Sequence, residues 1–285
     1  MPLRFFRLSG QLRRSASRLV LIFAIVCMAG LDRLPVVIGT AVVRQTQSPP
    51  LELGKAVERE LNGGQTHVYE LKLMAGQFAE VTVEQSGINV RATLFQNDGK
   101  AIFASDSHRG MRGIERVSVI ANSSNPYELK IQSVRELAVP GKYRVTLIAL
   151  RPVTSQDKIR LTAQELFAEG DRYRGTTDLP KARELYLQAL ARWETIGDVP
   201  RQAVTLRQIS AISGQLGLGQ QALGEGEQAA KLYRTLGDRS GEAHSIFTVG
   251  EAWRGVLHDL DRARIYYEQA LPICHEIGER LIEGL

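Results

Sequence analysis

Two short stretches contain the residue types that catalyse hydrolysis in other proteins. They are Ser105-Asp106-Ser107-His108 and Cys274-His275. A nucleophile needs a base within hydrogen-bond reach, and consecutive residues rarely converge in that way. Neighbours on a helix point about 100° apart, so Cys274 is expected to be a buried small residue rather than a catalytic thiol. We therefore predict no catalytic residues and expect that the chain is not an enzyme.

No metal or cofactor site is predicted. A hard cation such as Ca²⁺ takes six or more oxygen ligands, and Asp106 has too few oxygen donors around it in the sequence. The only other cysteine, Cys27, lies in the N-terminal apolar stretch. Cys274 would then be left without a partner for a disulfide once that stretch is removed.

The positive charge of the chain is concentrated at its N-terminus. Five arginines precede residue 19 with no acidic residue among them, and the formal net charge of the 285 residues is +5. Without those arginines the basic and acidic residues balance at 31 each. Nucleic acid is therefore not an expected partner, because its phosphates require a basic surface.

The arginines are followed by an uncharged apolar run, "LVLIFAIVCMAGL" (19–31). This run is shorter than the roughly 20 residues that span a bilayer. A cationic segment before a short apolar one is typical of a secretory signal. Residues 1–41 are predicted to be a signal peptide or, if uncleaved, a signal-anchor and the only membrane contact. We expect an exported protein of the periplasm, the cell envelope or the exterior.

Residues 42–50 are predicted to be a linker, after which apolar residues alternate with polar ones. In "FAEVTVEQ", Ala79, Val81 and Val83 share one face, while Glu80 and Thr82 lie on the other. Similar alternation predicts strands at 66–73, 78–85, 89–96, 100–105, 114–121, 127–133 and 142–150. Residues 51–152 are therefore predicted to form an antiparallel, jelly-roll-like β-sandwich.

This part of the sequence resembles the bacterial pre-peptidase C-terminal domain. The resemblance rests on "GGQTHVYELKLMAGQFAEVTVEQSG" (63–87), "NVRATLFQNDGKAI" (89–102) and "PGKYRVTL" (140–147). It implies an accessory module that accompanies enzymes or repeats, with glycan or surface contact as one role.

From residue 158 onwards the apolar period changes to three and four, which predicts helices. The same unit returns at a spacing of 40 or 41 residues, as Ala182, Ala222 and Ala263 illustrate. Each unit ends in similar punctuation, namely Gly197-Asp198, Gly237-Asp238 and Gly278-Glu279. Glycine is expected to end one helix in a left-handed cap, and the acidic residue to cap the next helix.

Residues 158–285 resemble a tetratricopeptide α-solenoid with long repeats, three units and the start of a fourth. The closest motifs are "GDRYRGTTDLPKARELYLQAL" (170–190) and "GEAWRGVLHDLDRARIYYEQAL" (250–271). The middle unit departs from the pattern, because Gly224 and Gly226 fall inside its second helix, where each costs about 1 kcal/mol.

The resemblance implies a concave face that binds a protein or peptide ligand. The positions that line this face in the family are Gln164, Phe167, Asp171 and Arg174 in the first unit, Val204, Arg207, Ala211 and Gly214 in the second, and His244, Phe247, Glu251 and Arg254 in the third. The asparagines and lysines of the family's carboxylate clamp are not matched in this sequence.

Three functions follow as expectations. The first is an exported protein–protein interaction scaffold without catalytic activity. The second is the regulatory N-terminal part of a caspase-like CHAT protease, which proteins with this organisation resemble and whose catalytic domain would follow Leu285. The third is carbohydrate binding by the β-sandwich. Apolar residues of the fourth unit, Leu281, Ile282 and Leu285, also predict self-association through an uncapped end.

Overall fold

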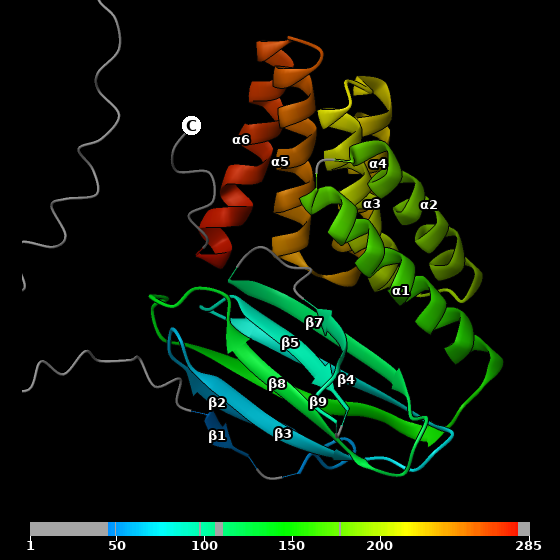
Figure 1. The fold of residues 1–285 in the computed structure, drawn as a ribbon. Coiled ribbons are helices and arrows are strands. Elements are labelled where there is room, and N and C mark those ends of the chain that lie inside the picture. Colours follow the sequence, from blue (N-terminus) through cyan, green and yellow to red (C-terminus); the bar gives the residue numbers. More distant parts are fainter. Residues whose placement is uncertain (1–44, 49, 97, 106–110, 177, 279–285) are drawn as a thin grey trace, which may run out of the picture. The chain divides into compact units, whose positions relative to one another are not determined.

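The computed structural model describes residues 45–48, 50–96, 98–105, 111–176 and 178–278. Within these ranges nine strands precede six helices along the chain (Figure 1). The predicted signal segment lies outside the described residues, and so does the start of the predicted fourth unit.

The strands form two sheets, which together we call the sheet region (residues 45–152). The five-stranded sheet has the order β1 (Gln45–Gln47), β3 (Thr66–Lys72), β8 (Pro126–Ser133), β5 (Val90–Phe95) and β6 (Ala101–Ser105). The four-stranded sheet has the order β2 (Ala56–Leu61), β9 (Gly141–Pro152), β4 (Gln77–Ser86) and β7 (Arg112–Ile120). All neighbouring strands are antiparallel except β1 and β3, which are parallel.

The seven predicted strands correspond to β3 through β9, with ends shifted by a few residues. Two strands were not predicted. Strand β1 lies inside the predicted linker. Strand β2 pairs with β9 alone, at the edge of its sheet. Its charged residues Glu58, Arg59 and Glu60 leave only Leu61 fully buried, so the strand has no clear apolar period.

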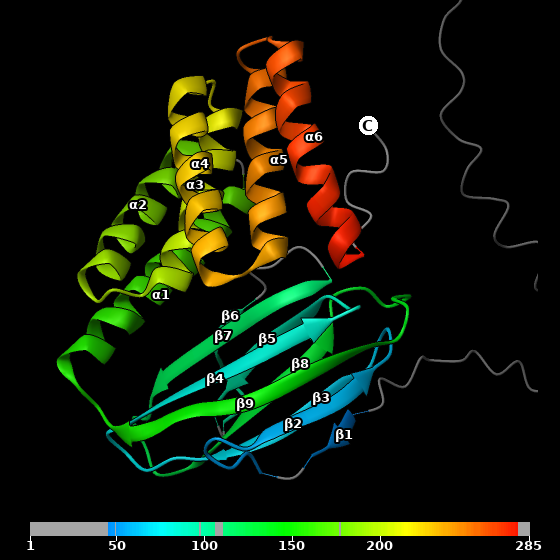
Figure 2. The same ribbon diagram turned by 180° about the vertical axis from the view of Figure 1, so that it is seen from behind.

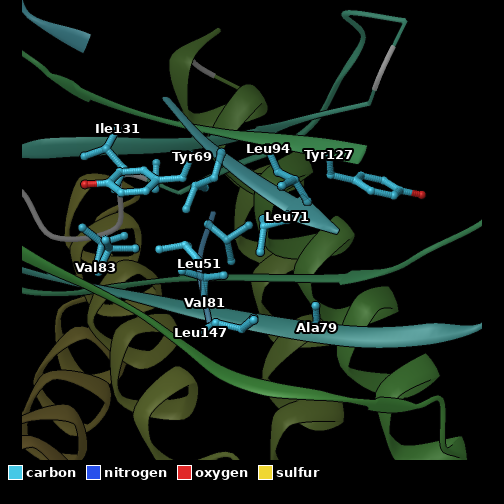
Figure 3. Close-up of a cluster of buried hydrophobic side chains, with 14 of the residues drawn as sticks. Leu51, Tyr69, Leu71, Ala79, Val81, Val83, Leu94, Tyr127, Ile131 and Leu147 are labelled. Carbon is cyan, nitrogen blue, oxygen red and sulfur yellow. The ribbon is translucent and has the colours of Figure 1, made fainter. Parts of the chain in front are cut away.

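One hydrophobic core lies between the two sheets. Tyr69 and Leu94 of the five-stranded sheet face Val81 and Val83 of the four-stranded sheet (Figure 3). All four side chains are buried. The predicted inward face of 78–85 is therefore confirmed.

The outer face of β4 is buried as well, which the alternation did not predict. Phe78, Glu80 and Thr82 point away from the core and are nevertheless at most 8% exposed. The guanidinium groups of Arg151 and Arg160 lie 4.8 and 5.7 Å from the centre of the Phe78 ring. Arg160 comes from the first helix, so helices cover this face.

The six helices form what we call the helical region (residues 155–277). They are α1 (Ser155–Gly175), α2 (Leu179–Thr195), α3 (Val199–Gln215), α4 (Gly219–Leu236), α5 (Arg239–Gly255) and α6 (Leu260–Ile277). Each helix packs against the next one along the chain, and α3 also contacts α5 (Figure 2). In the described part of the chain, no helix combines the length and the apolar character that a membrane crossing requires.

The predicted glycine–acid punctuation is present at two boundaries. Gly197 and Gly237 have φ angles of 67° and 70°, a left-handed conformation that glycine adopts without strain. Asp198 then caps α3 by accepting from the Arg201 amide, and Asp238 caps α5 by accepting from the Gly241 amide. At the third boundary Gly278 has a φ of 68°, while Glu279 lies outside the described residues.

The two helices of each pair approach closely where a small residue meets a large one. A Cβ atom on Gly170 would lie 2.8 Å from the Tyr186 ring, and one on Gly250 would lie 2.6 Å from the Tyr267 ring. The middle pair differs, because its second helix carries the glycine and its first helix presents the small residue Ser210. A Cβ atom on Gly226 would lie 2.8 Å from Ser210 Oγ.

Candidate functional site

A polar cluster holds the first helix to the second in the first unit. The Tyr186 hydroxyl donates to Asp171 Oδ1 at 2.6 Å, and Arg174 pairs with the same oxygen at 3.3 Å. The ring centres of Tyr186 and Phe167 are 5.1 Å apart. Burial, followed by the charge of Asp171, raises the pKa of Tyr186, so the phenol remains a donor.

The third unit repeats this cluster two repeats further on. The Tyr267 hydroxyl donates to Glu251, which also accepts from Arg254 at 2.6 Å. Phe247 lies 5.4 Å from Tyr267 between ring centres. Burial and the hydrogen bond to Glu251 raise the pKa of Tyr267 to about 12. In both units the predicted acidic residue and arginine are therefore paired with each other, and the predicted phenylalanine lies beside the tyrosine.

The middle unit lacks the whole cluster. Its corresponding residues are Arg207, Ala211, Gly214 and Gly226. No carboxylate, phenol or phenylalanine ring remains at these positions. Arg207 is half-buried on α3, and His244 is half-buried on α5. The cluster is therefore present in the first and third units, and Arg207 and His244 are predicted ligand-binding residues that lie between the two clusters along the chain.

Gln164 contacts the sheet region. Its amide nitrogen donates to the Ser118 carbonyl at 3.0 Å, and its oxygen accepts from the Ser118 amide at 3.3 Å. Gln164 is 5% exposed. It therefore extends the hydrogen bonding of β7 onto α1, in the way that a further strand would.

A second connection between the regions is ionic and buried. Arg201 on α3 donates to Glu80 on β4 at 3.1 Å, to Asp198 at 3.0 Å and to the Ser118 hydroxyl at 3.0 Å. Its guanidinium lies 5.0 Å from the centre of the Trp193 ring system. Burial would raise the pKa of Asp198, but the charges of Arg201 and Arg160 outweigh burial and lower it. Removal of one partner from such a group is strongly destabilising.

These contacts surround a cavity of about 170 Å³, which we call the junction cavity. Its walls come from β6 and β7 and from α1, α2, α3 and α4. The apolar part of the lining includes Phe103, Ile114, Phe167, Trp193, Val204 and Leu236. The charged part comprises Arg116, Asp171, Arg201 and Asp238. A cavity of roughly 150 Å³ can hold a benzene-sized molecule, so this one has room for a single side chain.

The charged groups of the junction cavity differ in how they are neutralised. Arg201 is paired with Glu80 and Asp198, and Asp171 is paired with Arg174. Asp238 caps α5. Arg116, which is half-buried on β7, makes no hydrogen bond and no ion pair with any residue in the described part of the chain. Burial lowers the pKa of Arg116, Glu80 opposes this effect, and Arg201 adds to it.

Four of the predicted ligand-binding residues line the junction cavity, namely Gln164, Phe167, Asp171 and Val204. The lining includes none of Arg174, Arg207, Ala211 and Gly214, and none of the third-unit residues His244, Phe247, Glu251 and Arg254. Binding by any of these residues remains a prediction.

The two stretches with potential catalytic residues have other surroundings. The Ser105 hydroxyl donates to the buried carboxylate of Glu115 at 2.5 Å. Asp106, Ser107 and His108 lie outside the described residues. Cys274 is 2% exposed, as predicted, and the neighbouring His275 is exposed.

No family model and no curated protein matches this chain. Among the solved structures that are similar to parts of it are two helical or β domains and one inhibitor. The TPR domain of Arabidopsis FLU is 14% identical, with a TM-score of 0.39, over 41% of this chain and 98% of that domain.

The other two similar structures each match 36% of this chain with a TM-score of 0.29. One is the pre-peptidase C-terminal domain of a collagenase from Bacillus anthracis, which is 16% identical over 94% of its length. The other is Aeromonas hydrophila PliG, a periplasmic inhibitor of g-type lysozyme, which is 22% identical over 97% of its length. The function of this chain is therefore inferred from the geometry of the junction cavity.

Sequence reasoning missed the residues that join the two regions. Arg116, Ser118 and Glu80 lie on outward-facing strand positions, where polar residues are expected on a solvated face. One signal was present, since Ser118 and Ile120 are small or apolar residues on the same outward face as Arg116. That signal does not indicate which element covers the face.

Proposed function

We propose that this chain is an exported, non-enzymatic interaction module that holds a protein or peptide partner at the junction cavity. The helical region would be a tetratricopeptide-type solenoid, and the sheet region a β-sandwich that supplies one wall of the binding site. The observation that supports this proposal is the lining of the cavity, in which apolar side chains from two strands and four helices meet a few charged ones. Ligand sites in proteins are typically concave and mostly apolar, with a small number of orienting polar groups.

The partner class follows from the shape of the site. A small-molecule site usually encloses about 300 Å³ or more, whereas this cavity encloses about 170 Å³. The cavity therefore suits one anchoring side chain, and the remainder of the ligand would lie outside it. Interfaces between proteins commonly concentrate their affinity in such anchors.

The test is selection of random dodecapeptides displayed on phage against the whole protein. Val204→Trp would fill the cavity from α3, and we expect it to abolish binding of the selected peptides. Leu187→Trp on α2 is the matched control, because Leu187 is 39% exposed and does not line the cavity. Ala168→Leu, a smaller change in the lining, is a second variant should Val204→Trp not fold.

Two results would overturn the proposal. One is that no peptide is enriched, and the other is that folded Val204→Trp and Ala168→Leu bind the selected peptides as well as Leu187→Trp does. Binding to a glycan array that is unchanged by Val204→Trp, in the absence of peptide binding, would favour the carbohydrate hypothesis instead.

Export is a separate part of the proposal, supported by the arginines and the short apolar run before residue 32. Residues 1–50 fused to a bacterial alkaline phosphatase, which is active only after export, should give active enzyme. Replacement of the apolar run by a polar one should abolish that activity. Equal activity of the two fusions would contradict export.

A further inference from the structure

Arg116 is the charged residue of the junction cavity whose side chain has no hydrogen-bonded or ion-paired partner among the described residues. The other charged residues of the lining are each paired with an oppositely charged side chain or cap a helix. Buried or half-buried guanidinium groups are normally paired, because an isolated charge away from water is unfavourable. The Arg116 side chain lines the cavity, and none of its N–H groups donates a hydrogen bond to a described residue.

The surroundings of Arg116 favour an anion of low charge. The closest paired groups include two further arginines, Arg160 and Arg201, and two carboxylates, Glu80 and Asp198, which all influence the pKa of Arg116. Two more carboxylates, Asp171 and Asp238, form part of the cavity wall. The four carboxylates Glu80, Asp198, Asp171 and Asp238 would repel the two negative charges of a phosphate dianion more strongly than the single charge of a carboxylate. The charge of Arg116 is sufficient to neutralise that single charge.

We propose that the junction cavity receives a glutamate or aspartate side chain of the partner, with its carboxylate on Arg116 and its methylene groups against Phe167 and Val204. This inference rests on the proposed function. A guanidinium binds a carboxylate through two parallel hydrogen bonds, which gives orientation as well as affinity.

An acidic side chain fits the cavity better than the end of a chain does. A terminal residue would bring both its carboxylate and its own side chain into a space that holds one side chain. An internal acidic residue brings in one side chain alone, while the peptide backbone continues outside the cavity.

The experiment compares peptide selections on three forms of the whole protein. The peptides are random dodecapeptides fused to the phage coat through their C-termini, so that no terminal carboxylate is free. We expect wild type to enrich Glu or Asp at one fixed position. Arg112→Gln should do the same, because Arg112 is an exposed arginine on the same strand, outside the cavity. Arg116→Gln should lose that enrichment.

A selected peptide is then synthesised with Glu or Gln at the enriched position. On wild type the change to Gln should weaken binding about tenfold or more, since hydrogen bonds between charged groups contribute at least this much. On Arg116→Gln both peptides should bind equally. Melting curves of the three forms would show that each is folded.

The inference is overturned if no acidic position is enriched, or if the change from Glu to Gln has the same effect on wild type and on Arg116→Gln. It is also overturned if only a library with free C-termini gives Arg116-dependent binding, which would assign the site to a terminal carboxylate. In each case the proposed function stands if Val204→Trp abolishes binding, and it fails separately if Val204→Trp has no effect.

Discussion

Asp157 joins the first turn of α1 to the last strand of the sheet region. Its carboxylate accepts from Arg151 at 2.6 and 2.8 Å, and from the Thr154 hydroxyl at 2.6 Å. Burial alone would raise the pKa of Asp157. The hydrogen bonds from Arg151 and Thr154 outweigh burial and lower the pKa from 3.8 to about 2. The folded protein therefore stabilises the charged form of Asp157.

Asp157→Asn is expected to lower the free energy of unfolding by about 2 kcal/mol at neutral pH, since one pKa unit corresponds to about 1.4 kcal/mol. A carboxyl with a depressed folded-state pKa contributes its stability above the unfolded pKa and loses it as the pH falls towards the folded value. The difference between wild type and variant should therefore shrink from about pH 4 to about pH 2.

Urea unfolding at several pH values, followed by tryptophan fluorescence, measures this difference. Glu165→Gln is the control, because Glu165 is exposed on the same helix. It should change stability little at any pH. A loss for Asp157→Asn that does not depend on pH would contradict the assigned role of the carboxylate.

At the scale of the helix, Gly224 and Gly226 are two glycines of α4 whose effects on stability are expected to be opposite. Both lie inside α4 and were predicted to weaken it. Gly224 has no atom within 4 Å of the position that a Cβ would occupy. A Cβ on Gly226 would lie 2.6 Å from a methyl carbon of Val249 and 2.8 Å from Ser210 Oγ. Gly226 is therefore required by the packing of α4 against α3 and α5.

Gly224→Ala should raise the free energy of unfolding by about 0.5–1 kcal/mol, because alanine favours the helix and restricts the unfolded chain. Gly226→Ala gains the same propensity but forces α3 or α5 to move, which costs about 1–3 kcal/mol. We expect a net loss for Gly226→Ala. Chemical denaturation of both variants measures these changes in the free energy of unfolding. Equal stabilisation by Gly224→Ala and Gly226→Ala would contradict the packing role of Gly226.

The elements themselves were largely predictable because their signals are local. Periods of two and of three to four give strands and helices, and Gly237 with Asp238 marks a helix boundary. Strand β2 was missed because an edge strand buries few side chains. The close approach at Gly226 was missed because it depends on Val249, which is distant in the sequence.

At the scale of the whole molecule, the contacts between the sheet and helical regions were not predictable. Arg201 and Glu80 are 121 residues apart, and each is an ordinary charged residue in its own segment. Their pairing depends on which face of β4 the helices cover, and the sequence holds no local signal for that choice. Two residues of the predicted ligand-binding face therefore have surroundings that the sequence did not predict. Gln164 contacts β7, and Phe167 lines a cavity that β7 helps to form.

The central claim is that the sheet and helical regions bind a partner jointly. Hydrogen–deuterium exchange of the whole protein, with and without a selected peptide, tests this claim most directly. Binding should slow exchange of backbone amides in β7 around Arg116, in α1 around Phe167 and in α3 around Val204 in the same experiment. Protection confined to α5 and α6, or to the sheet region alone, would contradict the account.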